Sequence, residues 1–230
     1  MLGIIGAMDK ETEKLFARMT DTEEFTCGYS RFTKGLLEGV PCVVARCGIG
    51  KVHAAVCAQI MLIRYPVTAV LNIGVAGALD DTLKIADCVI ASGEVQHDID
   101  TSPIGDPVGL ISGPNIIEVP CDAALTARLQ QAAEALSMHT LTAAIATGDQ
   151  FICGADRKRA LGKAFNAAAC DMEGGAIAQV CYENQIPYAA YRTISDTVED
   201  SGTAYFINAQ HAADQSVRLL EYFLQHYQEA

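Results

Sequence analysis

Short apolar segments rich in Val, Ile and Ala alternate along this chain with longer segments of helical period. Apolar runs of this kind are typical of strands buried on both faces of a sheet, and helices supply the connections between them. The alternation therefore predicts an α/β fold built on one sheet. The expected strands are Leu2–Ala7, Val40–Cys47, Val67–Ile73, Asp87–Ala91, Leu141–Ala146, Ala167–Met172 and Tyr188–Ile194.

The segments between these runs predict helices, because apolar residues recur in them at spacings of three and four. The clearest stripe runs from Phe206 to Leu224. Dense Pro and Gly between Asp98 and Pro120 predict a long ordered loop. No linker or repeat interrupts the chain, so we expect a single domain over residues 1–230. The expected helices are Lys10–Met19, Lys51–Arg64, Ala123–Leu136, Asp156–Phe165, Gly174–Asn184 and Tyr205–Gln228.

Acidic residues outnumber basic ones, with 28 Asp and Glu against 16 Lys and Arg, and the net charge is −12. An acidic chain gains nothing from counterion release, so we expect neither nucleic acid nor an anionic membrane as partner. The first residues lack the basic and apolar regions of a secretory signal, and no uncharged run predicts a membrane-spanning helix. We therefore expect a cytoplasmic protein that acts on a small molecule.

None of the nine cysteines forms a C-x-x-C pair. Cys42, Cys88 and Cys170 lie inside expected strands, where a reduced thiol behaves as a small apolar side chain. His97 and Asp98 are adjacent, and adjacent side chains point in different directions, which disfavours a shared metal ion. We expect reduced thiols, no metal site and no cofactor.

Glycine and acidic residues follow most of the expected strands. Ligands of open α/β sheets bind at the carboxyl ends of strands, so these positions are candidate site residues. The segment Gly48–Lys51 lacks the upstream Gly and the following Ser or Thr of a P-loop, and no G-x-G-x-x-G follows the first strand. Nucleoside triphosphates and dinucleotides are thus disfavoured as ligands.

The carboxylates are more informative, because Glu11, Glu173 and Asp196 each follow a strongly apolar run. For Glu11 and Glu173 taken singly, a charge placed at a helix N-terminus is an equal alternative. Asp196 lies four residues after Arg192 and four before Asp200, and it is a candidate proton donor. Acids that converge at strand ends suggest cleavage of a glycosidic bond. One carboxyl then protonates the leaving group, and another handles water or the positive charge on the sugar.

A set of short segments, taken in order, closely resembles the 5′-methylthioadenosine/S-adenosylhomocysteine nucleosidases. They are Gly3–Met8 with Glu11, Gly48–Val52, Gly74–Gly77, Thr147–Ile152, Asp171–Glu173 and Arg192–Asp196. That family belongs to the nucleoside phosphorylase superfamily. The resemblance implies a three-layer α/β/α sandwich with a central mixed, twisted sheet, and usually a homodimer.

The resemblance also implies a reaction, the hydrolysis of the N-glycosidic bond of 5′-methylthioadenosine and S-adenosylhomocysteine. In that reaction Glu11 activates the water that attacks the anomeric carbon, and Asp196 protonates adenine N7. The implied substrate-binding residues are Met8, Ile49, Gly77, Phe151, Ile152, Met172, Glu173, Arg192, Ser195 and Phe206.

Several of these residues have implied roles of their own. Glu173 binds the ribose hydroxyls with support from Arg192, and Phe151 stacks on the adenine ring while the Ile152 backbone holds its edge. Met172 lies beside the sugar. The pocket for the 5′-alkylthio group is lined by Met8, Ile49 and Phe206, and Ile104 and Pro107 of a partner subunit close it.

Two alternatives to a hydrolase remain open. In a purine nucleoside phosphorylase, phosphate replaces water as the nucleophile, and Asp9 and Glu11 in the first-strand turn disfavour that anion. A non-catalytic nucleoside-binding protein would lack one of the carboxylates, and none is missing. Val75 stands where many relatives carry Ser or Thr. The sequence does not rank methylthioadenosine, S-adenosylhomocysteine, 5′-deoxyadenosine and 6-amino-6-deoxyfutalosine as substrates.

Overall fold

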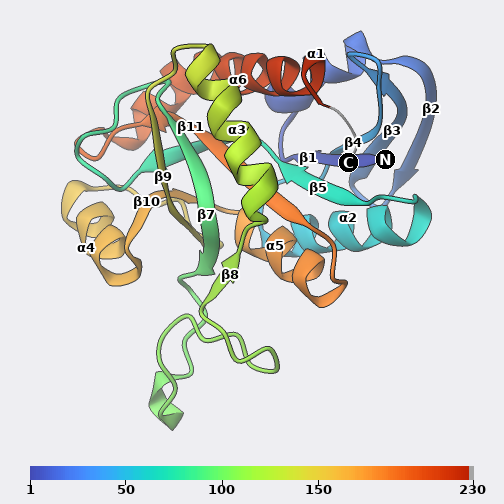
Figure 1. The fold of residues 1–230 in the computed structure, drawn as a ribbon. Helices are drawn as coiled ribbons and strands as arrows, with labels where there is room; N and C mark the ends of the chain where they lie inside the picture. The colour runs from blue at the N-terminus through green and yellow to red at the C-terminus, as the bar shows by residue number, and fades with distance from the viewer. Residues whose placement is uncertain (228–230) are drawn as a thin grey trace.

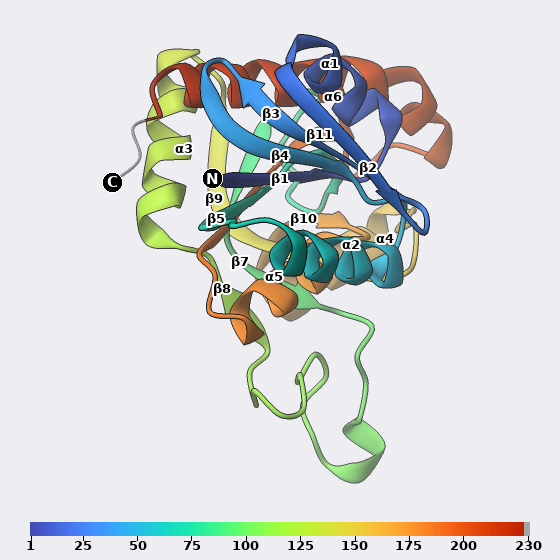
Figure 2. The same cartoon turned by 90° about the vertical axis from the view of Figure 1, so that its right-hand side faces the viewer.

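The computed structural model describes residues 1–227, which form a mixed sheet of eleven strands between two helical layers (Figures 1 and 2). The strands are β1 (Leu2–Gly6), β2 (Thr20–Cys27), β3 (Ser30–Leu37), β4 (Val40–Arg46), β5 (Ala69–Asn72), β6 (Val75–Ala78), β7 (Cys88–Gln96), β8 (Glu118–Pro120), β9 (Thr140–Thr147), β10 (Ala167–Asp171) and β11 (Tyr188–Asp196). The helices are α1 (Asp9–Arg18), α2 (Lys51–Arg64), α3 (Ala123–Ala135), α4 (Ala155–Phe165), α5 (Gly174–Glu183) and α6 (Gly202–Gln225), with the 3-10 helix η1 (Ser102–Ile104). The expected three-layer α/β/α architecture is confirmed.

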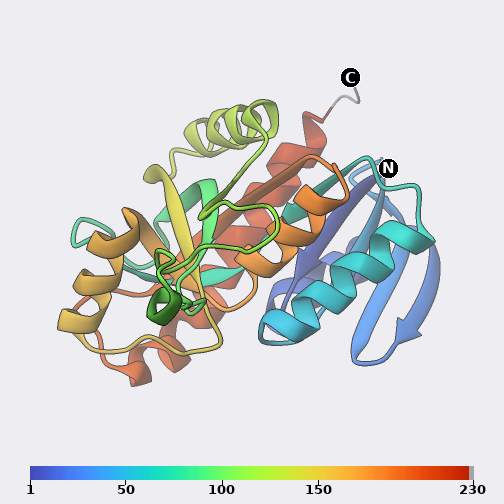
Figure 3. The same ribbon diagram turned by 90° about the horizontal axis from the view of Figure 1, so that it is seen from below.

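Each helical layer is held to the sheet by one apolar stripe per helix. On one face, α1, α3 and α6 bury Leu15, Leu129 and Leu220 in a common core cluster. On the other face, α2 and α5 bury Met61 and Ile177 in a second cluster. Figure 3 shows α2 and α5 side by side on that face.

The central strand β11 joins two halves of the sheet. Its first residues pair with β5 of the open half, in which the order is β2-β3-β4-β1-β5. Its later residues pair in parallel with β6, and it also pairs antiparallel with β7. Since β6 pairs with β10, β10 with β9 and β9 with β7, these strands and β11 form a closed ring. The start of β11 therefore lies beside the open half of the sheet, and its end at Asp196 lies within the ring.

All seven expected strands form, and β7 continues past its expected end at Ala91 to Gln96. The expected helices also form, with ends shifted by a few residues. The expected end of the last helix at Gln228 lies outside the described residues. Sequence analysis missed β2, β3, β6 and β8. The strand β2 has no apolar run, because it is almost fully exposed and rich in Thr and Glu. The strands β6 and β8 are only 4 and 3 residues long, which is too short for a period to identify them.

The expected loop between Asp98 and Pro120 extends away from the body of the molecule (Figure 1) and contains η1 and the short strand β8. All nine cysteines are free thiols, and Cys42, Cys88 and Cys170 are buried, as expected. Within residues 1–227, no helix combines the length and the apolar character that crossing a membrane requires.

Candidate active site

The carboxyl ends of β1, β10 and β11 and the segment around β6 surround one cavity. Glu11, Glu173 and Asp196 all line it, although they come from three distant parts of the sequence. The other expected site residues that line it are Met8, Ile49, Gly77, Phe151, Ile152, Met172 and Ser195. No Lys, Arg or His of the described chain lines this cavity. It is therefore an acidic pocket with an otherwise largely apolar wall.

Glu11 lies in the first turn of α1, and its carboxylate turns back toward the end of β1. Its Oε2 accepts hydrogen bonds from the backbone N–H of Ala7 (2.8 Å) and Met8 (2.9 Å), and its Oε1 accepts one from Val75 (3.1 Å). Gly74 leaves room for this carboxylate, because a Cβ there would lie 2.6 Å from Glu11 Oε1. Burial raises the pKa of Glu11, and the backbone donors oppose that rise. Glu11 thus accepts backbone hydrogen bonds at the start of α1 and also lines the cavity.

Glu173 immediately precedes α5, yet its carboxylate makes no hydrogen bond to that helix. Instead its Oε1 accepts a hydrogen bond of 2.7 Å from the backbone N–H of Gly50. The N–H of Gly174, at the start of α5, donates to Asp171 (2.9 Å). Glu173 thus stands at the N-terminus of α5, as its alternative role expects, but its carboxylate bonds to Gly50 and not to the helix. Burial, followed by the nearby charge of Asp171, raises the pKa of Glu173 to about 8.

Asp196 is buried at the end of β11, and each of its carboxyl oxygens has a fixed donor. The hydroxyl of Ser195 donates to Oδ1 (2.9 Å), and the ammonium of Lys158 donates to Oδ2 (2.5 Å). The side chain of Asp200 binds Thr197. The charged partner of Asp196 is therefore Lys158, and not Arg192 or Asp200. Sequence analysis did not consider Lys158.

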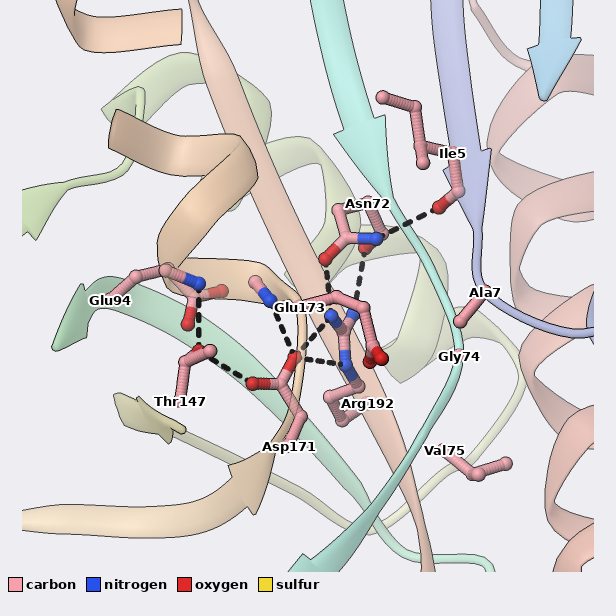
Figure 4. Close-up of polar contacts among 12 residues, drawn as sticks. Ile5, Ala7, Asn72, Gly74, Val75, Glu94, Thr147, Asp171, Glu173 and Arg192 are labelled. Carbon is pink, nitrogen blue, oxygen red and sulfur yellow. Dashed lines mark hydrogen bonds and ion pairs between the residues drawn. The ribbon is translucent and has the colours of Figure 1, made fainter. Parts of the chain in front are cut away.

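Arg192 does not line the cavity, which corrects its expected contact with the ribose. Its guanidinium is buried and bonds to Asp171 Oδ2 from Nε (3.1 Å) and Nη2 (2.5 Å), and it also donates to Asn72 (Figure 4). No hydrogen bond joins it to Glu173 within the described residues. Arg192 instead neutralises Asp171, which itself lines the cavity, and its positive charge acts on Glu173 from a distance.

The same buried layer contains a second acid, Glu94 on β7. Its Oε1 accepts a hydrogen bond from the Tyr188 hydroxyl (3.1 Å), whereas its Oε2 has no hydrogen-bond partner. Burial and the neighbouring charge of Asp171 raise the pKa of Glu94 well above its usual range. A protonated carboxyl fits this position, because an unpaired buried charge is costly.

The outer rim of the cavity is aromatic, but it uses Tyr205 where sequence analysis placed Phe206. Tyr205 lines the cavity, packs edge-on against Phe151 at 5.6 Å between ring centroids, and approaches the sulfur of Met8. Phe206 is 81% exposed, packs against the ring of Tyr205 and is not among the residues that line the cavity. The expectation for Phe206 is therefore wrong for this single chain. The helical period of α6 could have predicted the inward position of Tyr205, because Tyr205 lies four residues before the buried Ala209.

The remaining expected residues lie on the projecting loop. Ile104 is 82% exposed and Pro107 is also exposed, and neither lines the cavity of its own chain.

Comparison with known proteins agrees with this arrangement. The family model described as Phosphorylase superfamily matches residues 1–225. A 5′-methylthioadenosine/S-adenosylhomocysteine nucleosidase from Shewanella loihica is 35% identical over 227 residues, which cover 96% of this chain and 99% of the relative.

Two solved structures are also similar over nearly the whole chain. The nucleosidase of the same name from Neisseria meningitidis, in complex with methylthio-immucillin-A, has a TM-score of 0.93 at 28% identity and covers 98% of this chain and 99% of its own. The futalosine hydrolase of Helicobacter pylori has a TM-score of 0.92 at 32% identity and covers 98% and 97%. The chain therefore belongs to the phosphorylase superfamily and, within it, to the 5′-methylthioadenosine/S-adenosylhomocysteine nucleosidase family.

Proposed function

We propose that this chain hydrolyses the N-glycosidic bond of 5′-methylthioadenosine and S-adenosylhomocysteine and releases adenine. The observation that carries the proposal is the convergence of Glu11, Glu173 and Asp196 on one cavity. Hydrolysis of this bond builds positive charge on the sugar, and acidic side chains that surround the sugar stabilise that charge.

Each carboxylate has a separate proposed role. Glu11 is the base that activates water, because its raised pKa makes it a better proton acceptor than an exposed glutamate. Glu173 binds the ribose hydroxyls, and Asp196 protonates adenine N7 as the base departs. Ser195 supports this last step by fixing Asp196 Oδ1.

The apolar wall suits the other parts of the substrate. Phe151 and the Ile152 backbone hold the adenine, Met172 lies against the sugar, and Met8 and Ile49 contact the 5′-alkylthio group. Gly77 admits the nucleoside and the acid to the same space, because a Cβ there would lie 2.9 Å from Asp196 Oδ2.

Water is a better nucleophile than phosphate in this cavity. Glu11 stands where the nucleophile would enter, and the lining offers no Arg or Lys within the described residues. A phosphate charge 4 Å from one carboxylate would be opposed by about 4 kcal/mol at an effective dielectric of 20. The pocket thus favours hydrolysis over phosphorolysis.

The enzyme is further proposed to be a cytoplasmic homodimer. Val52 and Val56 on α2 are 73% and 49% exposed and lie on one side of the helix, with Ile49 just before it. A second copy that covers this stripe would also bring its projecting loop toward the cavity. Ile104 and Pro107 of the partner would then close the pocket around the alkylthio group.

The test is to incubate the protein with methylthioadenosine, and separately with S-adenosylhomocysteine, in phosphate-free buffer and to measure free adenine. We expect adenine without added phosphate. Glu11→Gln and Asp196→Asn should each lower kcat by about 100- to 10,000-fold, while Glu13→Gln, at an exposed position of the same helix, should keep the normal rate.

The other outcomes identify the alternatives. A strict requirement for phosphate would make the chain a phosphorylase. Tight binding of nucleoside without adenine release in either buffer would make it a binding protein.

A further inference from the structure

The helix α4 contains a buried lysine, Lys158, that has no part in the proposed mechanism. Lys158 is the one residue of α4 that is fully buried, and its side chain is only 1% exposed. A buried lysine is rare because removing an ammonium from water is costly, and it persists only with good partners. Lys158 therefore calls for an explanation beyond helix packing.

The partners of Lys158 both belong to the segment that carries the proposed acid. Its Nζ donates to Asp196 Oδ2 at 2.5 Å and to the carbonyl of Thr197 at 2.7 Å. Ser195 donates to the other carboxyl oxygen of Asp196. With a donor on each oxygen, the carboxyl group of Asp196 is held in one orientation at the edge of the cavity.

We propose that Lys158 is a positioning residue for the general acid: it holds Asp196 in the one orientation that faces the leaving adenine. This inference rests on the proposed function. As the proton moves to N7 and the glycosidic bond breaks, negative charge develops on the carboxyl oxygens. The adjacent ammonium is already in place to stabilise that developing charge.

Other ionisable groups face this pair but do not replace Lys158. Cys170 of β10 lies near both charges, Asp200 lies near Lys158, and Tyr205 of α6 lies near Asp196. None of the three is a cation. Lys158 is accordingly the group whose removal most changes the surroundings of the acid.

Removal of the ammonium should slow the reaction without weakening substrate binding. Lys158→Met keeps the length of the side chain without its charge, so Oδ2 of Asp196 loses its donor. We expect kcat to fall by about 10- to 100-fold with KM within about threefold. Lys163→Met, at an exposed position of the same helix, should match the wild type.

A double-mutant comparison separates this role from simple packing. If Lys158 acts through Asp196, Lys158→Met should change kcat by less than about twofold when it is added to Asp196→Asn. This pair of variants also serves if Lys158→Met alone does not fold, because the double variant removes both buried charges together.

Some results would overturn the inference. An equal loss of kcat from Lys158→Met in both backgrounds, or a wild-type kcat in the Lys158→Met variant, would show that Lys158 has no role through the acid. A wild-type enzyme that releases no adenine would instead remove the proposed function itself.

Discussion

At the scale of single residues, the three cavity carboxylates differ in what surrounds them. Glu11 is held by three backbone N–H groups, and Asp196 is held by an ammonium and a hydroxyl. Glu173 has one backbone donor and lies near the negative charges of Asp171 and Glu11. Burial and these charges raise the pKa of Glu173 to about 8, so it carries a proton near neutral pH in the ligand-free protein.

The raised pKa of Glu173 predicts a pH dependence of folding stability. Between the ordinary glutamate pKa and about 8, the folded protein holds a proton on Glu173 that the unfolded chain releases. The contribution of Glu173 to the free energy of unfolding is thus lost as pH rises from about 5 to 8, by a few kcal/mol at most. Glu173→Gln should flatten this decline in urea unfolding of the ligand-free protein.

Glu134→Gln, at an exposed position of α3, provides the control and should keep the wild-type slope. A Glu173→Gln protein whose stability falls with pH as steeply as that of the wild type would contradict the assignment of the proton to Glu173.

At the scale of elements, a buried cluster ties the strands that carry the site. Arg192 on β11 bonds to Asp171 at the end of β10 and to Asn72 at the end of β5. The amide of Asn72 in turn donates to the carbonyl of Ile5 on β1 (2.8 Å). Four strands are therefore fixed relative to one another just behind the cavity (Figure 4). This cluster keeps the strand ends, and with them the carboxylates, in register.

Replacement of Arg192 should lower the free energy of unfolding. Arg192→Met leaves Asp171 buried without its cation, and breaking a buried ion pair in this way costs about 3–5 kcal/mol. Arg159→Met breaks an exposed ion pair with Asp81 and should leave the free energy of unfolding nearly unchanged. Chemical denaturation of the two variants checks this, and equal losses would show that the Arg192 pair contributes no more than a surface contact.

At the scale of the whole molecule, one loop and one helix expose apolar side chains that a second copy would cover. Ile104 on the projecting loop is exposed and does not line the cavity of its own chain, and the α2 stripe of Val52 and Val56 is exposed. An apolar stripe and an apolar loop tip are both features that a second copy would cover.

The homodimer is checked by light scattering on a size-exclusion column. Wild-type protein should have twice the mass of one chain, and Val56→Asp should be monomeric because it places a charge in the proposed interface. The KM of this monomer for methylthioadenosine should rise by about tenfold or more, because the partner's loop no longer closes the pocket. Gln131→Asp, on the exposed side of α3, should remain dimeric. A wild-type protein that is monomeric and fully active would rule out the partner lid.

Elements with strong local patterns could be predicted from the amino-acid order alone. The seven buried strands and the helices each have a period that reports burial within the element, so their order and the acids that follow them could be predicted. Strands without such a period were missed, as the exposed β2 and the short β6 show. The resemblance to the nucleosidase family added the expectation that the acids meet around one substrate.

Contacts between distant side chains depend on tertiary packing. Nothing in the sequence distinguishes Lys158 from the other charged residues of α4, yet the packing of α4 places it against Asp196, 38 positions away. Arg192 likewise bonds to Asp171 and does not line the cavity, and Tyr205 lines it where Phe206 was expected. An apolar period shows that one face of a segment is buried, but it does not show which residues of other segments lie against that face. The pairing of two buried charges depends on how the ring of strands closes and on where the helices pack against it. The local pattern encodes neither.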